Sequence, residues 1–136
     1  MDSEGFLCGL QKIFGFKHVD MEKKKMKLYV SLPISGRCLK DVKVYAKRVK
    51  FKWETKGYNV ITPFDVVKED GKPYSFCMGR DVEALMECDG IVLCPDWFSS
   101  RGCRLEYNVA EIYKLKVFVD DTKYMGRYEH GTDGEV

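Results

Sequence analysis

The amino-acid sequence predicts an α/β fold, a three-layer sandwich in which helices cover both faces of a parallel sheet of four to five strands. Two observations lead to this prediction. Short apolar runs alternate along residues 27–119 with stretches of helical periodicity. Each predicted strand is also followed by a helix before the next strand, which is the connection that parallel strands need. A chain of 136 residues is long enough for one such core.

The first two strands and the helix between them are predicted in the first half of the chain. Residues 27–31 (KLYVS) form a short apolar strand, which ends at the turn-forming loop 32–37 (LPISGR). A helix over 38–53 follows, Gly57 suits its carboxyl end, and residues 58–61 form the second strand. One face of that helix is apolar at spacings of three and four, at Cys38, Val42, Tyr45, Val49 and Trp53.

The second half of the chain repeats this alternation. A polar loop at 62–75 leads to a helix over 76–89, and the apolar run 90–94 reads as a strand buried on both faces. The loop 95–102 leads to a third helix, and residues 115–119 form a fourth strand. The residues expected to face the core are Val82, Leu85 and Met86 in the second helix and Leu105, Val109, Ile112 and Tyr113 in the third.

This arrangement is Rossmann-like or flavodoxin-like, and it predicts where a ligand would bind. In such sheets the ligand lies beyond the carboxyl ends of the strands, where the strand order reverses. The loops at 32–37, 62–75 and 95–102 leave those strand ends. We therefore expect the functional residues in these three loops and in the first turns of the helices that follow them.

Both ends of the chain are predicted to lie outside the domain, which spans residues 26–120. Residues 1–25 are expected to form an N-terminal extension that is flexible or loosely docked, although a short amphipathic helix on a membrane surface fits the same residues. Residues 121–136 are expected to form a loosely held polar tail, with Tyr124 and Tyr128 as its anchors.

Composition excludes several classes of function. The net charge of +2 is too small to indicate nucleic-acid binding, and no apolar run reaches the roughly 18 residues of a membrane span. Six cysteines without a CxxC pair, together with two histidines, give no zinc pattern. Several cysteines lie in apolar runs, which favours reduced thiols and a cytoplasmic location. We expect no metal, no nucleic-acid partner and no membrane partner.

The loop LPISGR has two interpretations. It sets Ser35, Gly36 and Arg37 at the start of a helix, where free backbone N–H groups suit an anion such as phosphate. Arg37 could add a bidentate contact to that anion. An ordinary helix-capping turn would have the same local sequence, and the loop matches neither a dinucleotide motif nor a P-loop. The loop alone leaves both interpretations open.

The loop SSRG and the helix after it carry a candidate carboxylate. Glu106 lies four residues after Gly102 and four before Ala110, on a face of small residues that leaves room for a ligand. A glutamate on the helix surface would have the same neighbours, and Ser100 would then only cap the helix. Asp81 could likewise only complement a helix dipole. If both carboxylates meet at the ligand end of the sheet, they suit cleavage of a glycosidic bond.

Four stretches carry a resemblance to a known family. They are LYVSLPISG, GYNVITP, MGRDVEALMECDGIVLCPDW and SSRGCRLEYNVAEIYKLKVF, and with the segments between them they cover about two thirds of the chain. In order and spacing they resemble the nucleoside 2-deoxyribosyltransferase superfamily, and within it the branch of the nucleoside 5′-monophosphate N-hydrolases. The resemblance implies a small-molecule nucleotide or nucleoside as ligand, no cofactor, and a homodimer or higher homo-oligomer.

The resemblance also implies a role for individual residues. Glu106 would be the nucleophile that attacks C1′ of the substrate, Asp81 would orient it or hold the sugar, and Tyr29 would contact the carboxylate or the ribose. Ser100 stands where the transferases carry an aspartate for the sugar 5′-hydroxyl, which implies a substrate with a 5′-phosphate. The substrate-binding residues that follow from the resemblance are Pro33, Ile34, Ser35, Gly36, Arg37, Trp97, Ser100 and Gly102.

The expected function is therefore cleavage of the N-glycosidic bond of a (deoxy)nucleoside 5′-monophosphate through a glycosyl–Glu106 intermediate. Two alternatives remain open at this stage. A second base could accept the glycosyl group in place of water, which would make the protein a deoxyribosyltransferase. A module that kept the fold without the chemistry could bind a nucleotide or an ADP-ribose-like ligand.

Overall fold

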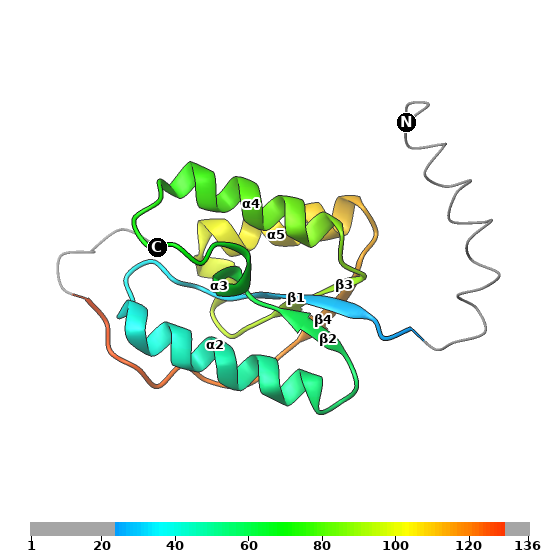
Figure 1. Ribbon diagram of the computed structural model, residues 1–136, viewed down its shortest axis with the longest axis horizontal. Helices are drawn as coiled ribbons and strands as arrows, with labels where there is room; N and C mark the ends of the chain where they lie inside the picture. The colour runs from blue at the N-terminus through cyan, green and yellow to red at the C-terminus, as the bar shows by residue number, and fades with distance from the viewer. Residues whose placement is uncertain (1–23, 130–136) are drawn as a thin grey trace.

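A computed structural model describes residues 24–129 and has the predicted α/β architecture (Figure 1). All strand pairs are parallel, and the strand order in the sheet is β2-β1-β3-β4. The strands are β1 (Lys27–Ser31), β2 (Asn59–Ile61), β3 (Gly90–Leu93) and β4 (Lys116–Val119). The helices are α2 (Leu39–Glu54), α3 (Pro63–Val66), α4 (Tyr74–Met86) and α5 (Arg101–Ile112), with a 3-10 turn η1 (Trp97–Ser99).

Helices cover the sheet on both faces, which confirms the three-layer arrangement. Helix α2 covers one face, and α4 and α5 cover the other (Figure 1). The chain moves from β1 outward to β2 and then returns to place β3 on the other side of β1. The strand order therefore reverses between β1 and β3, and their carboxyl ends form the crevice in which such sheets bind ligands.

The side chains of β1 point alternately to the two faces of the sheet and so contribute to two separate core clusters. Leu28 and Val30 face α2, where they pack with Val49 and Trp53. Tyr29 faces the opposite side, toward α4 and α5. Since successive side chains of a strand point to opposite faces, Ser31 shares the face of Tyr29. Two polar side chains of one strand are thus turned toward the same pair of helices.

The predicted inward faces of the helices on that side need correction. In α4, Asp81 and Leu85 are buried, whereas Met86 is exposed. In α5, the predicted apolar stripe is largely exposed, at Leu105 and Ile112 in the helix and at Tyr113 just after it. The buried residues of α5 are Cys103, Glu106 and Ala110. These three positions also recur at spacings of three and four, so periodicity alone could not decide which stripe packs against the sheet.

The predicted loop at 62–75 contains a short helix. Thr62 caps α3 by accepting a hydrogen bond from the N–H of Phe64, and the Asp65 carboxylate accepts one from the N–H of Thr62. This reciprocal arrangement is a capping box, and Pro63 suits the first helical position. The four residues of α3 shorten the loop.

The predicted tail at 121–136 is firmly held in residues 121–129, which run along α2 (Figure 1), and its predicted anchors Tyr124 and Tyr128 both contact Arg37. The buried Asp120 carboxylate accepts hydrogen bonds from the Trp53 indole at 2.8 Å and from the N–H of Thr122. The Tyr45 hydroxyl donates to the carbonyl of Thr122. Lone polar residues in the sequence gave no sign of these partners, which lie some 70 positions away. Of the predicted N-terminal extension at 1–25, residues 1–23 lie outside the described part of the chain, as do residues 130–136 of the tail.

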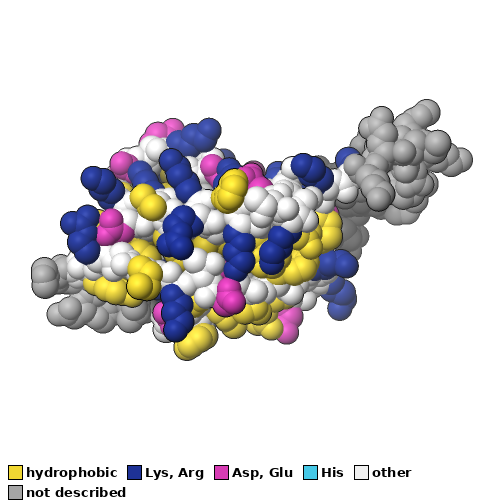
Figure 2. Space-filling view, turned by 90° about the horizontal axis from the view of Figure 1, so that it is seen from below, with side chains coloured by type: hydrophobic (Ala, Val, Ile, Leu, Met, Phe, Trp, Pro, Cys, Tyr) yellow, Lys and Arg dark blue, Asp and Glu magenta, His cyan; other side chains and the backbone are white. Residues whose placement is uncertain are grey.

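Charged side chains are dispersed over the α2 face. Lys and Arg side chains alternate there with apolar and acidic ones (Figure 2). Lys43 pairs with Asp70 and Lys50 pairs with Asp65, at 3.2 and 3.0 Å. None of the helices described between residues 24 and 129 combines the length and hydrophobicity of a membrane span.

Candidate active site

A cavity of about 710 Å³ opens at the carboxyl ends of β1 and β3. Its size falls within the usual range for small-molecule sites. Three segments contribute most of its wall: the loop after β1, the start of α4, and the turn that leads into α5. The lining residues are Leu32, Pro33, Ile34, Ser35, Gly36, Arg37, Pro63, Tyr74, Met78, Asp81, Asp96, Ser99, Ser100, Arg101, Gly102, Cys103, Glu106, Tyr128 and Glu129.

Glu106 is a buried glutamate whose two carboxylate oxygens are both hydrogen-bonded. The Tyr29 hydroxyl donates to Oε2 at 2.8 Å, and the Ser31 hydroxyl donates to Oε1 at 2.6 Å. Its side chain is only 4% exposed and lines the cavity. The interpretation of Glu106 as a helix-surface charge is therefore excluded by its burial. The two donors fix the carboxylate in one orientation.

Ser31 is a site residue that sequence reasoning missed. It is fully buried, and it reaches Glu106 because it stands two positions after Tyr29 on the same face of β1. The sequence contained a usable signal, since a side chain two positions from Tyr29 on a strand shares its face and would take part in the same site. The strand was interpreted only as an apolar run, which hid its serine.

Asp81 is the second carboxylate of the cavity. It is 6% exposed, and its Oδ1 is buried without a hydrogen-bond partner among the described residues. Burial raises the pKa of Asp81 to about 6, while the nearby Tyr29 hydroxyl acts in the opposite direction. A buried polar atom without a partner needs an explanation, and a ligand hydroxyl in the cavity would supply the missing hydrogen bond.

The same environment acts on the acidity of Glu106. Burial raises the pKa of Glu106 to about 8, and Asp81 contributes to the increase. The hydrogen bonds from Ser31 and Tyr29 act against it, because they stabilise the charged form. A carboxyl group with these neighbours can hold or release a proton near neutral pH. Such a group in a cavity suits nucleophilic or acid–base chemistry.

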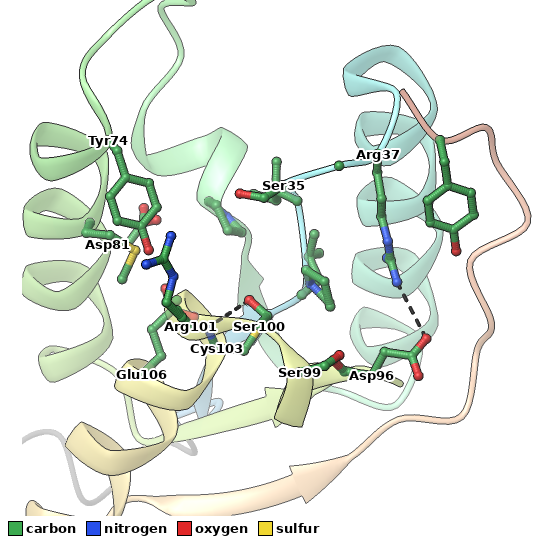
Figure 3. A pocket seen from close by; sticks show the side chains of 18 of the residues that line it. Ser35, Arg37, Tyr74, Asp81, Asp96, Ser99, Ser100, Arg101, Cys103 and Glu106 are labelled. Carbon is green, nitrogen blue, oxygen red and sulfur yellow. Dashed lines mark hydrogen bonds and ion pairs between the residues drawn. The ribbon is translucent and has the colours of Figure 1, made fainter. Parts of the chain in front are cut away.

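Arg37 lies on the opposite side of the cavity from Glu106 and Asp81 (Figure 3). Its guanidinium is buried and stands 4.3 Å from the ring centre of Tyr124. The nearest acidic partner is Asp96, at 3.7 Å, and Nη1 is buried without a partner in the described part of the chain. A buried cation with an unused donor is suited to an anionic ligand group.

The turn before α5 combines a helix cap with a wall of the cavity. Ser100 accepts a hydrogen bond from the N–H of Cys103 at 3.2 Å, so the predicted cap is present. Gly102 faces α4 closely, because an added Cβ would stand 3.3 Å from the sulfur of Met78 and 3.4 Å from the Tyr74 hydroxyl. The small residue four positions before Glu106 therefore leaves space that a side chain would fill.

Most of the sequence-predicted residues meet at the cavity, and two do not line it. Pro33, Ile34, Ser35 and Gly36 line it beside Arg37, and Gly36 has a φ of 83°, which favours glycine. Tyr29 lies behind Glu106 instead of on the cavity surface. Trp97 packs against the Tyr107 ring at 4.9 Å, away from the lining.

Further lining residues were not predicted. Tyr74 and Met78 lie seven and three positions before Asp81 on α4, so they share its face, and this spacing was a usable signal. Arg101 and Asp96 bring a second cation and a further carboxylate. Among residues 24–129, no cluster of three or more His, Cys, Asp or Glu side chains could hold a metal ion.

Comparison with known proteins adds a family without an assigned activity. A family model described as "Domain of unknown function (DUF4406)" matches residues 26–119. No curated protein matches the chain at a significant level. The matched range contains the four strands, Glu106, Asp81 and Arg37, and it ends before the segment that carries Tyr124 and Tyr128.

Proposed function

Because the chain belongs to the family described as Domain of unknown function (DUF4406), whose description assigns no activity, we propose a function from the site itself: cleavage of the N-glycosidic bond of a (deoxy)nucleoside 5′-monophosphate. One observation supports this most. A buried glutamate, held by Tyr29 and Ser31, stands beside a second carboxylate in a cavity that has a buried arginine on its far side. The sequence resemblance to the nucleoside 2-deoxyribosyltransferases supports the same chemistry.

The proposed reaction has two steps. An oxygen of the Glu106 carboxylate attacks C1′ while the C1′–N bond breaks, and the electron pair of that bond leaves with the base, which takes up a proton. Water then attacks C1′ of the glycosyl ester and loses a proton, which restores the carboxylate and releases the sugar phosphate. One water molecule is consumed for each bond cleaved. Retention of configuration at C1′ is the stereochemical consequence of two displacements.

The remaining polar groups have distinct proposed roles. The two hydroxyl donors hold Glu106 in the orientation for attack. Asp81 either carries the proton that the departing base takes up or accepts a hydrogen bond from a sugar hydroxyl at its unused Oδ1. The developing positive charge on the sugar is stabilised by these carboxylates, so the reaction requires no metal or organic cofactor. Arg37 provides the positive charge for the 5′-phosphate, and the neutral Ser100 does not repel it.

We propose further that the protein acts in the cytoplasm as a homodimer or higher homo-oligomer on a small-molecule substrate. Exposed apolar side chains on α5 and the edge strand β4, including Ile112 and Val119, support self-association. The pairing of lysines such as Lys43 and Lys50 with acidic residues favours a small-molecule substrate over a nucleic acid, since their charge is already compensated.

A panel of ribonucleoside and deoxyribonucleoside 5′-monophosphates tests the proposal. We expect the wild-type protein to release free base from at least one of them, detected by chromatography, and Glu106→Gln to lose this activity by about a thousandfold or more. Glu111→Gln, which changes an exposed glutamate of the same helix, is the matched control. If the wild type and Glu106→Gln behave alike on every nucleotide, the proposed activity is wrong.

Two alternative outcomes remain distinguishable in the same assay. Exchange of a labelled free base into the nucleoside, in preference to hydrolysis, would identify a deoxyribosyltransferase. A pKa of about 8 keeps much of Glu106 protonated at neutral pH, which favours a binding module without turnover as the second candidate. That module would show ligand-induced thermal stabilisation that survives in Glu106→Ala and disappears in Arg37→Ala, with no base released.

A further inference from the structure

The C-terminal segment 124–129 packs against the loop that carries Arg37. The Tyr124 ring lies 4.3 Å from the guanidinium carbon, and the Tyr128 ring centre lies at 6.0 Å. Arg37 and Tyr128 also form an isolated antiparallel β-bridge. Two aromatic rings of one segment therefore contact a buried arginine that lies some 90 positions earlier in the sequence. An aromatic face attracts a guanidinium group and limits its orientations.

The backbone of the same segment is fixed to the loop at several points. The N–H of Cys38 donates to the carbonyl of Arg127 at 2.8 Å, and the N–H of Glu129 donates to the carbonyl of Gly36 at 3.0 Å. The Asp41 carboxylate, on the first turn of α2, accepts hydrogen bonds from the Arg127 backbone and from its Nε, both at 2.9 Å. The segment is thus held at both sides of Arg37.

Arg37 has little else to define its orientation. Its only ion pair among the described residues is with Asp96, at 3.7 Å, and that carboxylate is 64% exposed. An ion pair at this distance with a largely exposed carboxylate contributes little. Meanwhile Nη1 is buried and unpartnered although the residue lines the cavity. The contact with the Tyr124 ring is therefore the main constraint on the orientation of this cavity-lining side chain.

We propose that segment 124–129 determines the phosphate specificity of the site, with Tyr124 as the positioning residue that holds Arg37 toward the 5′-phosphate. This inference rests on the proposed function in one respect, the assignment of the phosphate to Arg37. Tyr124 does not line the cavity, so it acts on the ligand only through Arg37. Arg127 and Asp41 act one step further away by anchoring the segment.

The test is a double-mutant cycle with a probe that carries no base. Binding of ribose 5-phosphate and 2-deoxyribose 5-phosphate to the full chain is measured by calorimetry. We expect Tyr124→Leu to weaken binding about tenfold, the size of a desolvated cation–π contact, and Tyr124→Phe to restore most of it. In an Arg37→Met background, Tyr124→Leu should cause no further loss. Met125→Ala is the matched control, because Met125 is 82% exposed in the same segment.

A second variant covers the case in which Tyr124→Leu fails to fold, which thermal melting would reveal. Gly126→Ala keeps the tyrosine but displaces the segment, because the added Cβ would stand 2.5 Å from the Cβ of Asp41 and from the Tyr124 hydroxyl. We expect the same loss of sugar phosphate binding, again only when Arg37 is present.

Three results would overturn the inference: unchanged binding in a folded Tyr124→Leu or Gly126→Ala protein, an equal loss with and without Arg37, or no binding of either sugar phosphate by the wild type. Failure of the proposed function has a different signature. Coupled binding through Tyr124 and Arg37 without release of any base would refute the glycosidase activity and leave this inference in place.

Discussion

The Ser31 hydroxyl lies 2.6 Å from Oε1 of Glu106, although 75 positions separate the two residues in the sequence. Both side chains are buried, and the Tyr29 hydroxyl contacts the second oxygen of the same carboxylate. One strand thus supplies both donors that hold the candidate nucleophile. This relationship connects the strand order of the sheet to the chemistry of the site, because β1 lies at the position where the strand order reverses.

Removing either donor should change the pH dependence of base release. Tyr29→Phe and Ser31→Ala each withdraw a hydrogen bond that favours the charged form, so the pKa of Glu106 should rise further. The acidic limb of the kcat/KM profile should then move to higher pH, and the rate at pH 7 should fall about 10- to 100-fold. Tyr107→Phe is the control: the Tyr107 hydroxyl donates to Glu111 at 3.5 Å, so its removal should keep the wild-type profile. An unmoved acidic limb in both variants would contradict the role assigned to these donors.

Glu106 should also make folding stability depend on pH. Its folded pKa of about 8 exceeds the ordinary value of 4.5, so the folded state retains a proton that the unfolded state has lost. The contribution of Glu106 to the free energy of unfolding is therefore fully present below about pH 4.5 and is lost as the pH rises through about 8. Asp81 acts in the same direction, up to about pH 6.

The measurement is denaturant unfolding of the wild type and Glu106→Gln between pH 5 and pH 8. The free energy of unfolding of the wild type should fall by on the order of 2 kcal/mol more than that of the variant across this window, because the variant has no proton to release. Glu111→Gln, an exposed position on the same helix, should follow the wild-type curve. Parallel curves for the wild type and Glu106→Gln would show that the carboxyl group is not titrating in this range.

Ser100→Asp should reverse the preference for a phosphorylated substrate. Ser100 lines the cavity and caps α5, and aspartate is also a good cap, so the helix should remain intact. The added negative charge should raise KM for the 5′-monophosphate at least tenfold and improve the relative use of the nucleoside without phosphate. Ser100→Asn provides the neutral control of the same shape. Equal kinetics for the Asp and Asn variants would indicate that the phosphate does not lie near Ser100.

Gly90 should be required for close approach of β3 to its neighbours. An added Cβ would stand 2.9 Å from the carbonyl oxygen of Lys116 and 3.0 Å from a methyl group of Leu28. Gly90→Ala should therefore destabilise the protein by about 1–3 kcal/mol. Gly79→Ala is the contrasting control, because no atom lies within 4 Å of its added Cβ in α4. That substitution should stabilise the protein by about 0.5–1 kcal/mol, measured by urea unfolding. Equal effects at the two positions would contradict the close packing at β3.

Sequence patterns predicted the elements and the buried face of α2 correctly, at Val42, Tyr45, Val49 and Trp53, but they did not predict the buried faces of α4 and α5. The strands of the sheet were predicted because a run such as 90–94 is apolar throughout, and β3 is indeed buried along its length. The inward face of α5 was mispredicted, because Leu105 and Ile112 outweigh Cys103 and Ala110 in any count of apolar residues. A helix that packs a carboxylate inward breaks the rule that the most apolar stripe is the buried one.

Patterns along the chain were enough to predict the α/β class, the parallel sheet and the end of the sheet at which Glu106, Asp81 and Arg37 line one cavity. This was possible because strand and helix periods, turn residues and crossover rules are local properties of the chain. The contact of Ser31 with Glu106 and the packing of segment 124–129 on Arg37 became apparent only in the folded protein. These contacts join residues 75 to about 90 positions apart, and their geometry depends on how whole elements pack, which no local pattern encodes.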